Sequence, residues 1–260
     1  MPVLPSRGAG PTLRCMRASA VGASDRGRWR PTNEDAFRVR TELGLALVAD
    51  GMGGHAAGEV ASNVAADVVM EELARRPPER ADATGPALRA AILAAHAAVI
   101  ERARREPDKR GMGTTLTVLA LDLSTPGFHI AHVGDSRAYR LRRGVLELLT
   151  RDHTWVQEQV DAGRLTAAEA RRRPNANILT RALGIELDES EVDTVAGAVE
   201  PGDLFLLCTD GLTGPVEDED LLAILDRDLP LEVLADQLIE AANLRGGPDN
   251  ITVVLVRALE

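Results

Sequence analysis

The sequence has few of the residues that mark a disulfide framework, a zinc site or a nucleic-acid surface. Among 260 residues there are two cysteines, Cys15 and Cys208, which lie far apart and show no CxxC spacing. Neither a set of disulfides nor a cysteine zinc site is therefore expected, and Cys208, inside an apolar run, is interpreted as a small buried side chain. Aromatic residues make up only 2% and the net charge is −10, which disfavours base stacking and binding to a phosphate backbone.

Long apolar runs are also missing. No uninterrupted apolar segment is long enough to span a membrane. Residues 1–10 contain no apolar core of a secretory signal, so we expect a cytoplasmic protein. Lys109 is the only lysine, and the arginines and the many alanines indicate a GC-rich bacterial genome.

The remaining pattern predicts strands interrupted by pairs of helices. Residues 1–14 are rich in proline and glycine and are predicted to be a disordered extension, with one domain over residues 15–260. Strands are predicted at 17–24, 43–49, 114–121, 128–133, 137–141, 191–199, 203–209 and 251–256, and helices at 56–75, 86–105, 152–173, 218–225 and 230–244. Strands and helices do not alternate regularly, which favours a layered α+β sandwich over a doubly wound sheet. The segment at about 152–184 interrupts the strands and is interpreted as an insertion.

Aspartates stand at the ends of three predicted strands. Asp50 follows the strand at 43–49, Asp210 follows the strand at 203–209, and Asp249 precedes the strand at 251–256. A single Asp-Gly pair is usually a simple turn. Three aspartates beside buried strands are harder to explain as turns, and they indicate a cluster.

Two further aspartates, Asp35 and Asp135, belong to the same hypothesis. Clustered carboxylates repel one another unless they are protonated or bridged by cations. Oxygen ligands without histidine or cysteine favour Mg²⁺ or Mn²⁺ over Zn²⁺. Gly51 has no side chain, so its backbone carbonyl can also come close to an ion.

Hard cations of this kind suit phosphate chemistry. Paired ions lower the pKa of a bound water and neutralise the charge of a phosphoryl group. An arginine can then hold the remaining phosphate oxygens with two parallel hydrogen bonds. Arg30, five residues before Asp35, is the candidate for this task. A solvated loop arginine is the alternative interpretation.

Six segments occur in a fixed order along the chain. They are Arg30-Pro31-Thr32-Asn33-Glu34-Asp35, Val48-Ala49-Asp50-Gly51-Met52-Gly53-Gly54-His55, Gly111-Met112-Gly113-Thr114-Thr115, Val133-Gly134-Asp135-Ser136-Arg137, Thr209-Asp210-Gly211-Leu212 and Gly246-Gly247-Pro248-Asp249-Asn250. Together they resemble the signature set of the bacterial 2C-type, metal-dependent (PPM) Ser/Thr protein phosphatases. The resemblance extends from about Arg17 to the C-terminus.

The resemblance implies a fold and a set of site residues. The fold would be a central antiparallel β-sandwich flanked by paired helices, in α-β-β-α layers. Two bridged Mn²⁺ or Mg²⁺ ions and a third, weaker one would be held by Asp50, the Gly51 carbonyl, Asp210, Asp249 and Asp135. Asp35 would act through water, and Glu34 beside it would assist. Arg30 would bind the substrate phosphate. The insertion at about 152–184 would be a flap that governs substrate choice.

Two positions depart from the family pattern. Met52 stands where many eukaryotic members have a histidine that is their proposed general acid, and a thioether cannot donate a proton. His55 is a nearby substitute, with shaping of the next helix as its alternative role. Arg173-Pro174 replaces a His-Pro pair that is frequent in the bacterial flap, which puts a histidine role there in doubt. His153 is present in the flap but matches a different position.

The function implied by the resemblance is hydrolysis of phosphoserine and phosphothreonine on proteins by a metal-activated water, without a phosphoenzyme. The expected partners are phosphorylated proteins, including a cognate Ser/Thr kinase, and we expect a monomer. An alternative is a phosphatase dedicated to one anti-sigma-factor antagonist. An alternative of another class is a catalytically inactive binding module, which would be expected to lose metal ligands that this chain keeps.

Overall fold

A computed structural model describes residues 16–53, 56–78, 81–122, 124–185, 187–188 and 191–260. The predicted extension at 1–14 and His55 lie outside these residues. The strands are β1 (Arg17–Asp25), β2 (Ala36–Arg40), β3 (Leu45–Ala49), β4 (Gly51–Met52), β5 (Gly113–Thr114), β6 (Leu116–Asp122), β7 (Gly127–Val133), β8 (Arg137–Arg142), β9 (Val145–Leu148), β10 (Asp193–Ala198), β11 (Leu204–Cys208) and β12 (Ile251–Leu259). The helices are α1 (Ala56–Arg75), α2 (Ala81–Arg105), α3 (Trp155–Asp161), α4 (Ala167–Arg171), α5 (Asp210–Thr213), α6 (Asp218–Leu225) and α7 (Leu231–Leu244).

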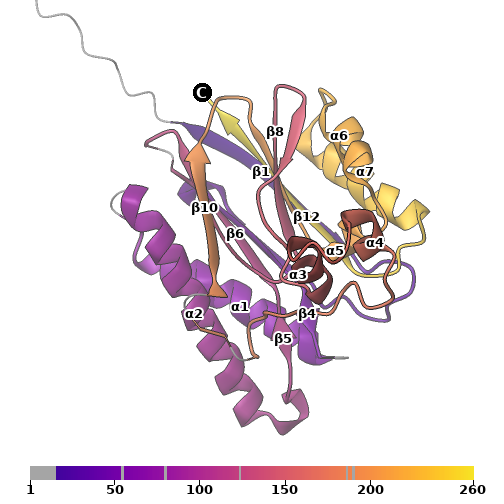
Figure 1. Ribbon diagram of the computed structural model, residues 1–260. Coiled ribbons are helices and arrows are strands. Elements are labelled where there is room, and N and C mark those ends of the chain that lie inside the picture. The colour runs from indigo at the N-terminus through magenta and orange to yellow at the C-terminus, as the bar shows by residue number, and fades with distance from the viewer. Residues whose placement is uncertain (1–15, 54–55, 79–80, 123, 186, 189–190) are drawn as a thin grey trace, which may run out of the picture.

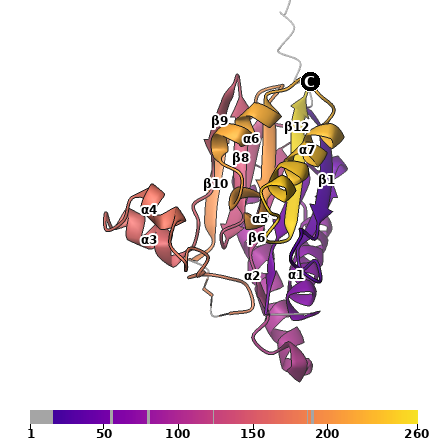
Figure 2. The ribbon, with the colours of Figure 1, turned by 90° about the vertical axis from the view of Figure 1, so that its right-hand side faces the viewer.

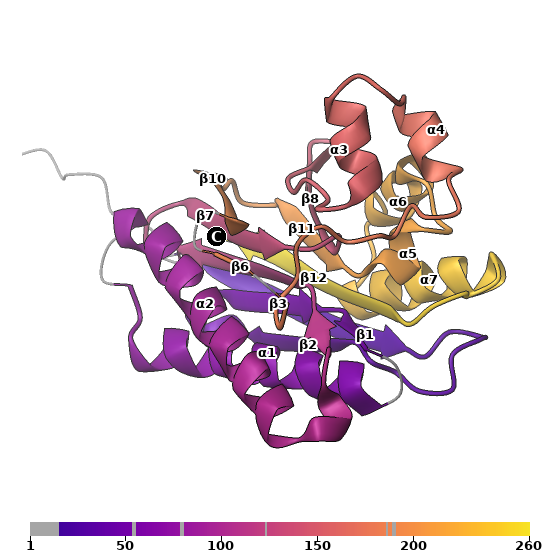
Figure 3. The same cartoon turned by 60° about the horizontal axis from the view of Figure 1, so that its bottom comes forward.

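Two antiparallel five-stranded sheets form the centre of the molecule. Their strand orders are β1-β12-β11-β8-β9 and β10-β7-β6-β3-β2. Helices α1 and α2 cover the outer face of the second sheet, and α6 and α7 cover the outer face of the first (Figure 1, Figure 3). The predicted α-β-β-α sandwich is therefore confirmed.

The continuous apolar runs in the sequence arise because the central strands are buried on both faces. In β11, Phe205 and Leu207 point between the sheets, whereas Leu206 and Cys208 pack towards α6 and α7. Strand β3 is arranged in the same way, with its alternate residues in two different clusters. A strand covered on both faces needs no polar alternation. The interpretation of Cys208 as a buried side chain is confirmed.

Helix α2 begins five residues earlier than predicted, at Ala81, and contains Pro86 near its start. By length and composition alone, Asp82–Arg105 is the one described helix that could cross a membrane. Its apolar stripe includes Leu88, Ile92 and Val99, which are buried in the cluster shared with α1 and the sheet. Packing in the core is therefore a sufficient reason for the apolar composition of this helix.

The predicted helix at 152–173 is wrong, because the segment forms two short helices. Thr154 caps α3 through the backbone N–H of Gln157, and the chain then turns at Gly163, whose φ is +68°. A capping box of Thr166 and Glu169 starts α4. Gly163 therefore terminates the chain segment after α3, and the cap at Thr166 starts α4. Figure 2 shows α3 and α4 standing apart from the layered body.

The aspartate-bearing strand ends meet at one end of the sandwich. Ala36 pairs with Ala49, so the start of β2 lies beside the end of β3. Leu116 pairs with Val133, so the end of β7 lies beside the start of β6, which itself pairs with β3. In the other sheet the end of β11 lies beside the start of β12, since Cys208 pairs with Val253. The register thus gathers side chains that are distant in sequence.

Candidate metal centre

Asp50 is fixed by its own backbone at the end of β3. Its N–H donates to Thr115 Oγ1 at 2.9 Å, and its carbonyl accepts the N–H of Thr115 and the hydroxyl of Thr114, each at 2.9 Å. The next residue, Gly51, leaves no room for a side chain. A Cβ there would stand 2.2 Å from the carbonyl oxygen of Gly58. The close approach explains why glycine is required at this position.

Asp35 is buried between the two sheets. Its Oδ2 accepts a hydrogen bond of 2.8 Å from the Thr209 hydroxyl, and the N–H of Thr252 donates to that same hydroxyl at 3.0 Å. Its Oδ1 is buried and has no hydrogen-bond partner in the described structure. A buried carboxylate oxygen without a donor is costly, so this atom indicates a site for a ligand or a water.

Asp249 and Asp210 approach from the other sheet. The Arg30 guanidinium donates to Asp249 Oδ2 at 2.6 Å. Asp210 begins α5 and accepts a hydrogen bond of 3.1 Å from the side-chain amide of Asn177. Arg30, half exposed, therefore lies at the same centre as the predicted metal ligands. Its contact in this structure is one of those ligands.

Asp135 follows β7 and is buried. Burial, and then repulsion by Asp210 and Asp152, raises the pKa of Asp135 well above its usual value. Repulsion between Asp135 and Asp210 means that the fifth predicted carboxylate is close enough to influence the others. The structure thus brings all five predicted aspartates into one electrostatic neighbourhood.

The carboxylates raise one another's pKa. Burial raises the pKa of Asp35 to about 7, with further repulsion from Asp210 and Asp249 and an opposing effect of the threonine hydrogen bonds. Burial, and then Asp35, Asp210, Asp135 and Asp249, raises the pKa of Asp50 well above its ordinary value. Burial and Asp249 raise the pKa of Asp210 to about 6, against a hydrogen bond with Asp50. These aspartates can all be ionised together only if a cation compensates their negative charge.

The donor set fits a hard divalent cation, although the side chains do not form a closed cage. In the part of the chain that the structure describes, no three Asp, Glu, His or Cys side chains are gathered tightly enough to hold an ion. Asp249 is engaged by Arg30 and Asp210 by Asn177. The unpartnered Oδ1 of Asp35, the mutual repulsion and the all-oxygen donors are the features that fit Mg²⁺ or Mn²⁺.

Two supporting residues, Asn250 and Asn177, were given no role in the sequence analysis. Asn250 accepts the N–H of Glu34 at 2.8 Å and donates to the carbonyls of Arg26 and Thr32, both at 2.9 Å, so it holds the loop that carries Arg30. Asp249 was predicted as a metal ligand because it carries a carboxylate, whereas the amide of Asn250 indicated no particular chemistry. Asn177 lies in an insertion whose approach to Asp210 could not be read from the sequence.

Comparison with known proteins gives one consistent result. The family model described as protein phosphatase 2C matches residues 22–244. The chain is 44% identical over 239 residues to the serine/threonine protein phosphatase PstP of Mycobacterium tuberculosis, covering 91% of this chain and 44% of that protein. It therefore spans less than half the length of this relative. It is 41% identical over 240 residues to the serine/threonine phosphatase Stp of Listeria monocytogenes, covering 90% of this chain and 93% of the relative.

A solved structure shows the same fold. The catalytic domain of PstP, in complex with two manganese ions, matches with a TM-score of 0.83 and 38% identity. The match covers 94% of this chain and 100% of that chain.

Stability without divalent cations should fall as the pH rises. The folded-state pKa of Asp35 is about 7, against 3.8 for a free side chain. A raised pKa gives stability that is complete below about 3.8 and is lost as the pH rises through 7, because the folded state binds more protons. In chelator, the free energy of unfolding should drop by on the order of 3 kcal/mol from pH 4 to pH 8. Urea denaturation at several pH values measures this.

Mn²⁺ added at pH 8 should restore the loss, since binding to the folded state alone stabilises it. Asp35→Asn cannot ionise at this position and should reduce the pH dependence in chelator, leaving the part that comes from the raised pKa values of Asp50, Asp135 and Asp210. A chelated wild-type protein with equal stability at pH 5 and pH 8 would contradict this account.

Proposed function

Because the chain belongs to the protein phosphatase 2C family, we propose that it hydrolyses phosphoserine and phosphothreonine on proteins with the help of Mn²⁺ or Mg²⁺. The observation that carries the proposal is the buried, mutually repelling set of aspartates with Arg30 at its edge. Carboxylates that repel need cations, and a phosphate ester needs both cations and an arginine. The manganese ions of the related PstP catalytic domain support the choice of metal.

The proposed metal ligands are Asp50, the Gly51 carbonyl, Asp210, Asp249 and Asp135. Bound ions would lower the pKa of a water and neutralise phosphate charge. All four of these carboxylates stand within two residues of a strand end, and the backbone contacts of Asp50 with Thr114 and Thr115 hold it in place. Rigid placement matters because a catalytic group must be aligned with its target before reaction.

Arg30 and Asp35 have separate proposed tasks. Arg30 presents several N–H donors in a planar fork and lies within reach of Asp249, so its guanidinium can hold phosphate oxygens beside the ligands. Asp35 keeps one buried oxygen free of protein donors. That oxygen can accept a hydrogen bond from the attacking water and so orient it. Attack and departure then occur in one displacement at phosphorus.

Proteins phosphorylated by a Ser/Thr kinase are the proposed substrates, with the kinase itself among the partners. The flap at 152–184 is proposed to influence them. Two contacts support this role: Asn177 donates to Asp210, and Arg171 forms an ion pair with Glu217 outside the flap. These contacts join the flap both to the site and to the α5–α6 connection. An inactive binding module is disfavoured, because the whole proposed ligand set is present.

Phosphate release from a phosphothreonine peptide should require a divalent cation and Asp50. Asp50→Ala removes a proposed metal ligand, so metal affinity and activity should collapse by at least about a hundredfold. Malachite-green detection with Mn²⁺, with Mg²⁺ and with chelator measures the effect. Asp122→Ala, at the half-buried last residue of β6, is the matched carboxylate control and should remain active. Full turnover of wild-type protein in excess chelator would rule out the proposal.

Arg30→Ala should lower kcat/KM for the phosphopeptide by roughly ten- to a hundredfold, because a charge-assisted phosphate contact is worth about 1.5–3 kcal/mol. Much of the loss should appear in KM. Arg30→Lys keeps the positive charge but loses the planar pair of N–H donors. Its kcat/KM should lie between those of the wild type and Arg30→Ala. Arg28→Ala, at an exposed arginine nearby, is the control. Wild-type kcat/KM in Arg30→Ala would exclude the assignment of Arg30 as the phosphate clamp.

Asp135→Ala should distinguish substrates by their leaving groups. Asp135 is proposed to hold a third, weaker cation, which when bound would supply the acidity that a leaving serine alkoxide needs. Para-nitrophenolate needs little protonation. The variant should therefore lose most phosphoserine hydrolysis, at least about tenfold, and keep part of its para-nitrophenyl phosphate activity. Calorimetry should still detect two tight ions. Loss of those two ions, or unchanged phosphoserine turnover, would refute this role.

A further inference from the structure

The loop that carries Asp135 is held in an unusual backbone conformation. Gly134 has φ of +108°, a region that side chains disfavour. A Cβ there would stand 2.5 Å from the Cβ and Cγ2 atoms of Thr115. Thr115 in turn binds Ser136 Oγ at 2.7 Å and the backbone of Asp50. The Gly134–Asp135 loop is thus pressed against the residue that also anchors Asp50.

His153 binds both polar groups of Gly134. The backbone N–H of His153 donates to the Gly134 carbonyl at 2.8 Å, and the Gly134 N–H donates to His153 Nδ1 at 3.1 Å. The His153 side chain is 1% exposed. In the dry interior such hydrogen bonds are not exchanged with water, so they define the conformation of the loop strongly.

These contacts fix the proton of the imidazole. Nδ1 accepts from Gly134, so the ring is neutral and its proton is on Nε2. Nε2 lies 3.1 Å from Asp193 Oδ2 and donates to it. Arg181 holds the other oxygen of Asp193 at 3.2 Å. Burial lowers the pKa of His153, against the opposing hydrogen bond to Asp193, which agrees with a neutral ring.

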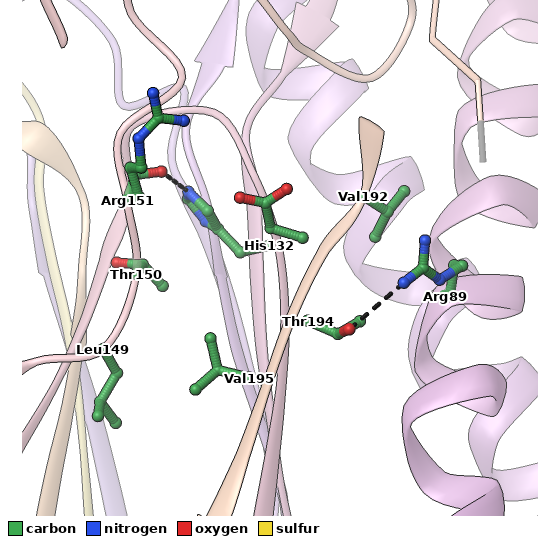
Figure 4. A pocket seen from close by; sticks show the side chains of 9 residues that line it. Arg89, His132, Leu149, Thr150, Arg151, Val192, Thr194 and Val195 are labelled. Atoms are coloured by element: carbon green, nitrogen blue, oxygen red, sulfur yellow. Dashed lines mark hydrogen bonds between the residues drawn. The ribbon is translucent and has the colours of Figure 1, made fainter. Parts of the chain in front are cut away.

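His153 also stands where the flap joins the sheets. Its carbonyl accepts the N–H of Thr180, and Thr154 forms a bridge with Leu179. Both ends of the flap are therefore tied together at this residue. The orienting carboxylate, Asp193, starts β10 and borders a pocket of about 280 Å³, and other lining residues are shown in Figure 4.

The other buried histidine nearby makes a different pattern of contacts. The nitrogens of His132 lie 2.8 Å from Thr117 Oγ1 and 3.2 Å from the Arg151 carbonyl, the second of which is visible in Figure 4. Thr117 donates to the carbonyl of Ser136, which follows Asp135, at 3.1 Å, so His132 reaches this loop only through a second side chain. His96 accepts the N–H of Gly184 at 3.2 Å, the same type of bond as in His153 but beside another glycine. Only the partner of His153, among these three, precedes a proposed ligand.

We propose that His153, oriented by Asp193, is a positioning residue that holds the Gly134–Asp135 loop in the geometry needed for phosphoserine hydrolysis. The inference rests on the proposed function, since it takes Asp135 as a ligand of that site. His153 touches neither substrate nor the reacting atoms. It acts through the backbone of Gly134, in the manner of outer-sphere residues that orient metal ligands.

Replacement of His153 by two different side chains tests the inference. His153→Leu removes the acceptor for Gly134. It should lower kcat for a phosphoserine peptide at least about tenfold while para-nitrophenyl phosphate turnover falls less, as expected for Asp135→Ala. His153→Asn places an amide oxygen at the position of Nδ1 and should recover most of the lost activity. His96→Leu is the matched control and should leave the ratio of the two activities unchanged.

Amide hydrogen exchange at Gly134, followed by NMR, supplies a readout apart from activity. Exchange should become faster in His153→Leu and return towards the wild-type rate in His153→Asn. If His153→Leu does not fold, Asp193→Leu, which leaves the ring unoriented, should shift the activity ratio in the same direction. An unchanged ratio in the folded variants, or His153→Asn as impaired as His153→Leu, would overturn the inference.

The two possible failures give different results. Wild-type protein without phosphopeptide activity in Mn²⁺ would refute the proposed function itself. Active wild-type protein with a substrate-selective Asp135→Ala, but a normal His153→Leu, would refute the role of His153 and leave the proposed function standing.

Discussion

Repulsion between buried aspartates is the constraint on which the rest of this structure depends. Burial and neighbouring carboxylates raise the pKa of Asp35, Asp50, Asp135 and Asp210. Such an arrangement costs free energy unless protons or cations compensate it. The fold must therefore supply enough stability elsewhere. Two sheets with apolar side chains on both faces, each covered by helices, provide that reserve.

The same repulsion explains how the site is built. A carboxylate on a flexible loop would move away from its neighbours, whereas one at the end of a buried strand cannot. Asp50 is held through its peptide groups by Thr114 and Thr115, and Asp35 is held by Thr209. Threonine hydroxyls can bind backbone and carboxylate without adding charge. Uncharged supports therefore place the charges and leave carboxylate oxygens for other partners.

The sequence predicted the layers and the positions of the aspartates because those features depend on local patterns. Apolar runs predicted β3, β11 and β12, and Asp50, Asp210 and Asp249 stand at their ends as expected. The pattern failed for β2, whose Phe-Arg-Val-Arg alternation was too short to stand out. The pattern also failed at 152–173, where the helix-favouring composition concealed the break between α3 and α4 at Gly163.

The supporting residues could not be predicted, because each acts on a partner far along the chain. Asn250 lies 216 residues from Glu34, and Asn177 lies 33 residues from Asp210. His153 was recognised only as a flap histidine at the wrong position for the family pattern. Its proposed role depends on its hydrogen bonds with Gly134, and no local pattern in the sequence connects these two residues. The roles assigned to the site residues remain predictions.

The contacts of His153 bear on how a flap and a metal ligand can be coupled. Both flap ends meet at His153 and Thr154, and His153 grips the peptide that precedes Asp135. A displacement of His153 would therefore shift Gly134 and Asp135 directly, because only the hydrogen bonds between His153 and Gly134 separate the flap from this loop. Asp50 has its own backbone anchors, Thr114 and Thr115, and Thr114 also pairs with Leu183 near the end of the flap. Both carboxylates are thus supported beside the flap, Asp135 through His153 at one end of it and Asp50 through the pairing of Thr114 with Leu183 at the other.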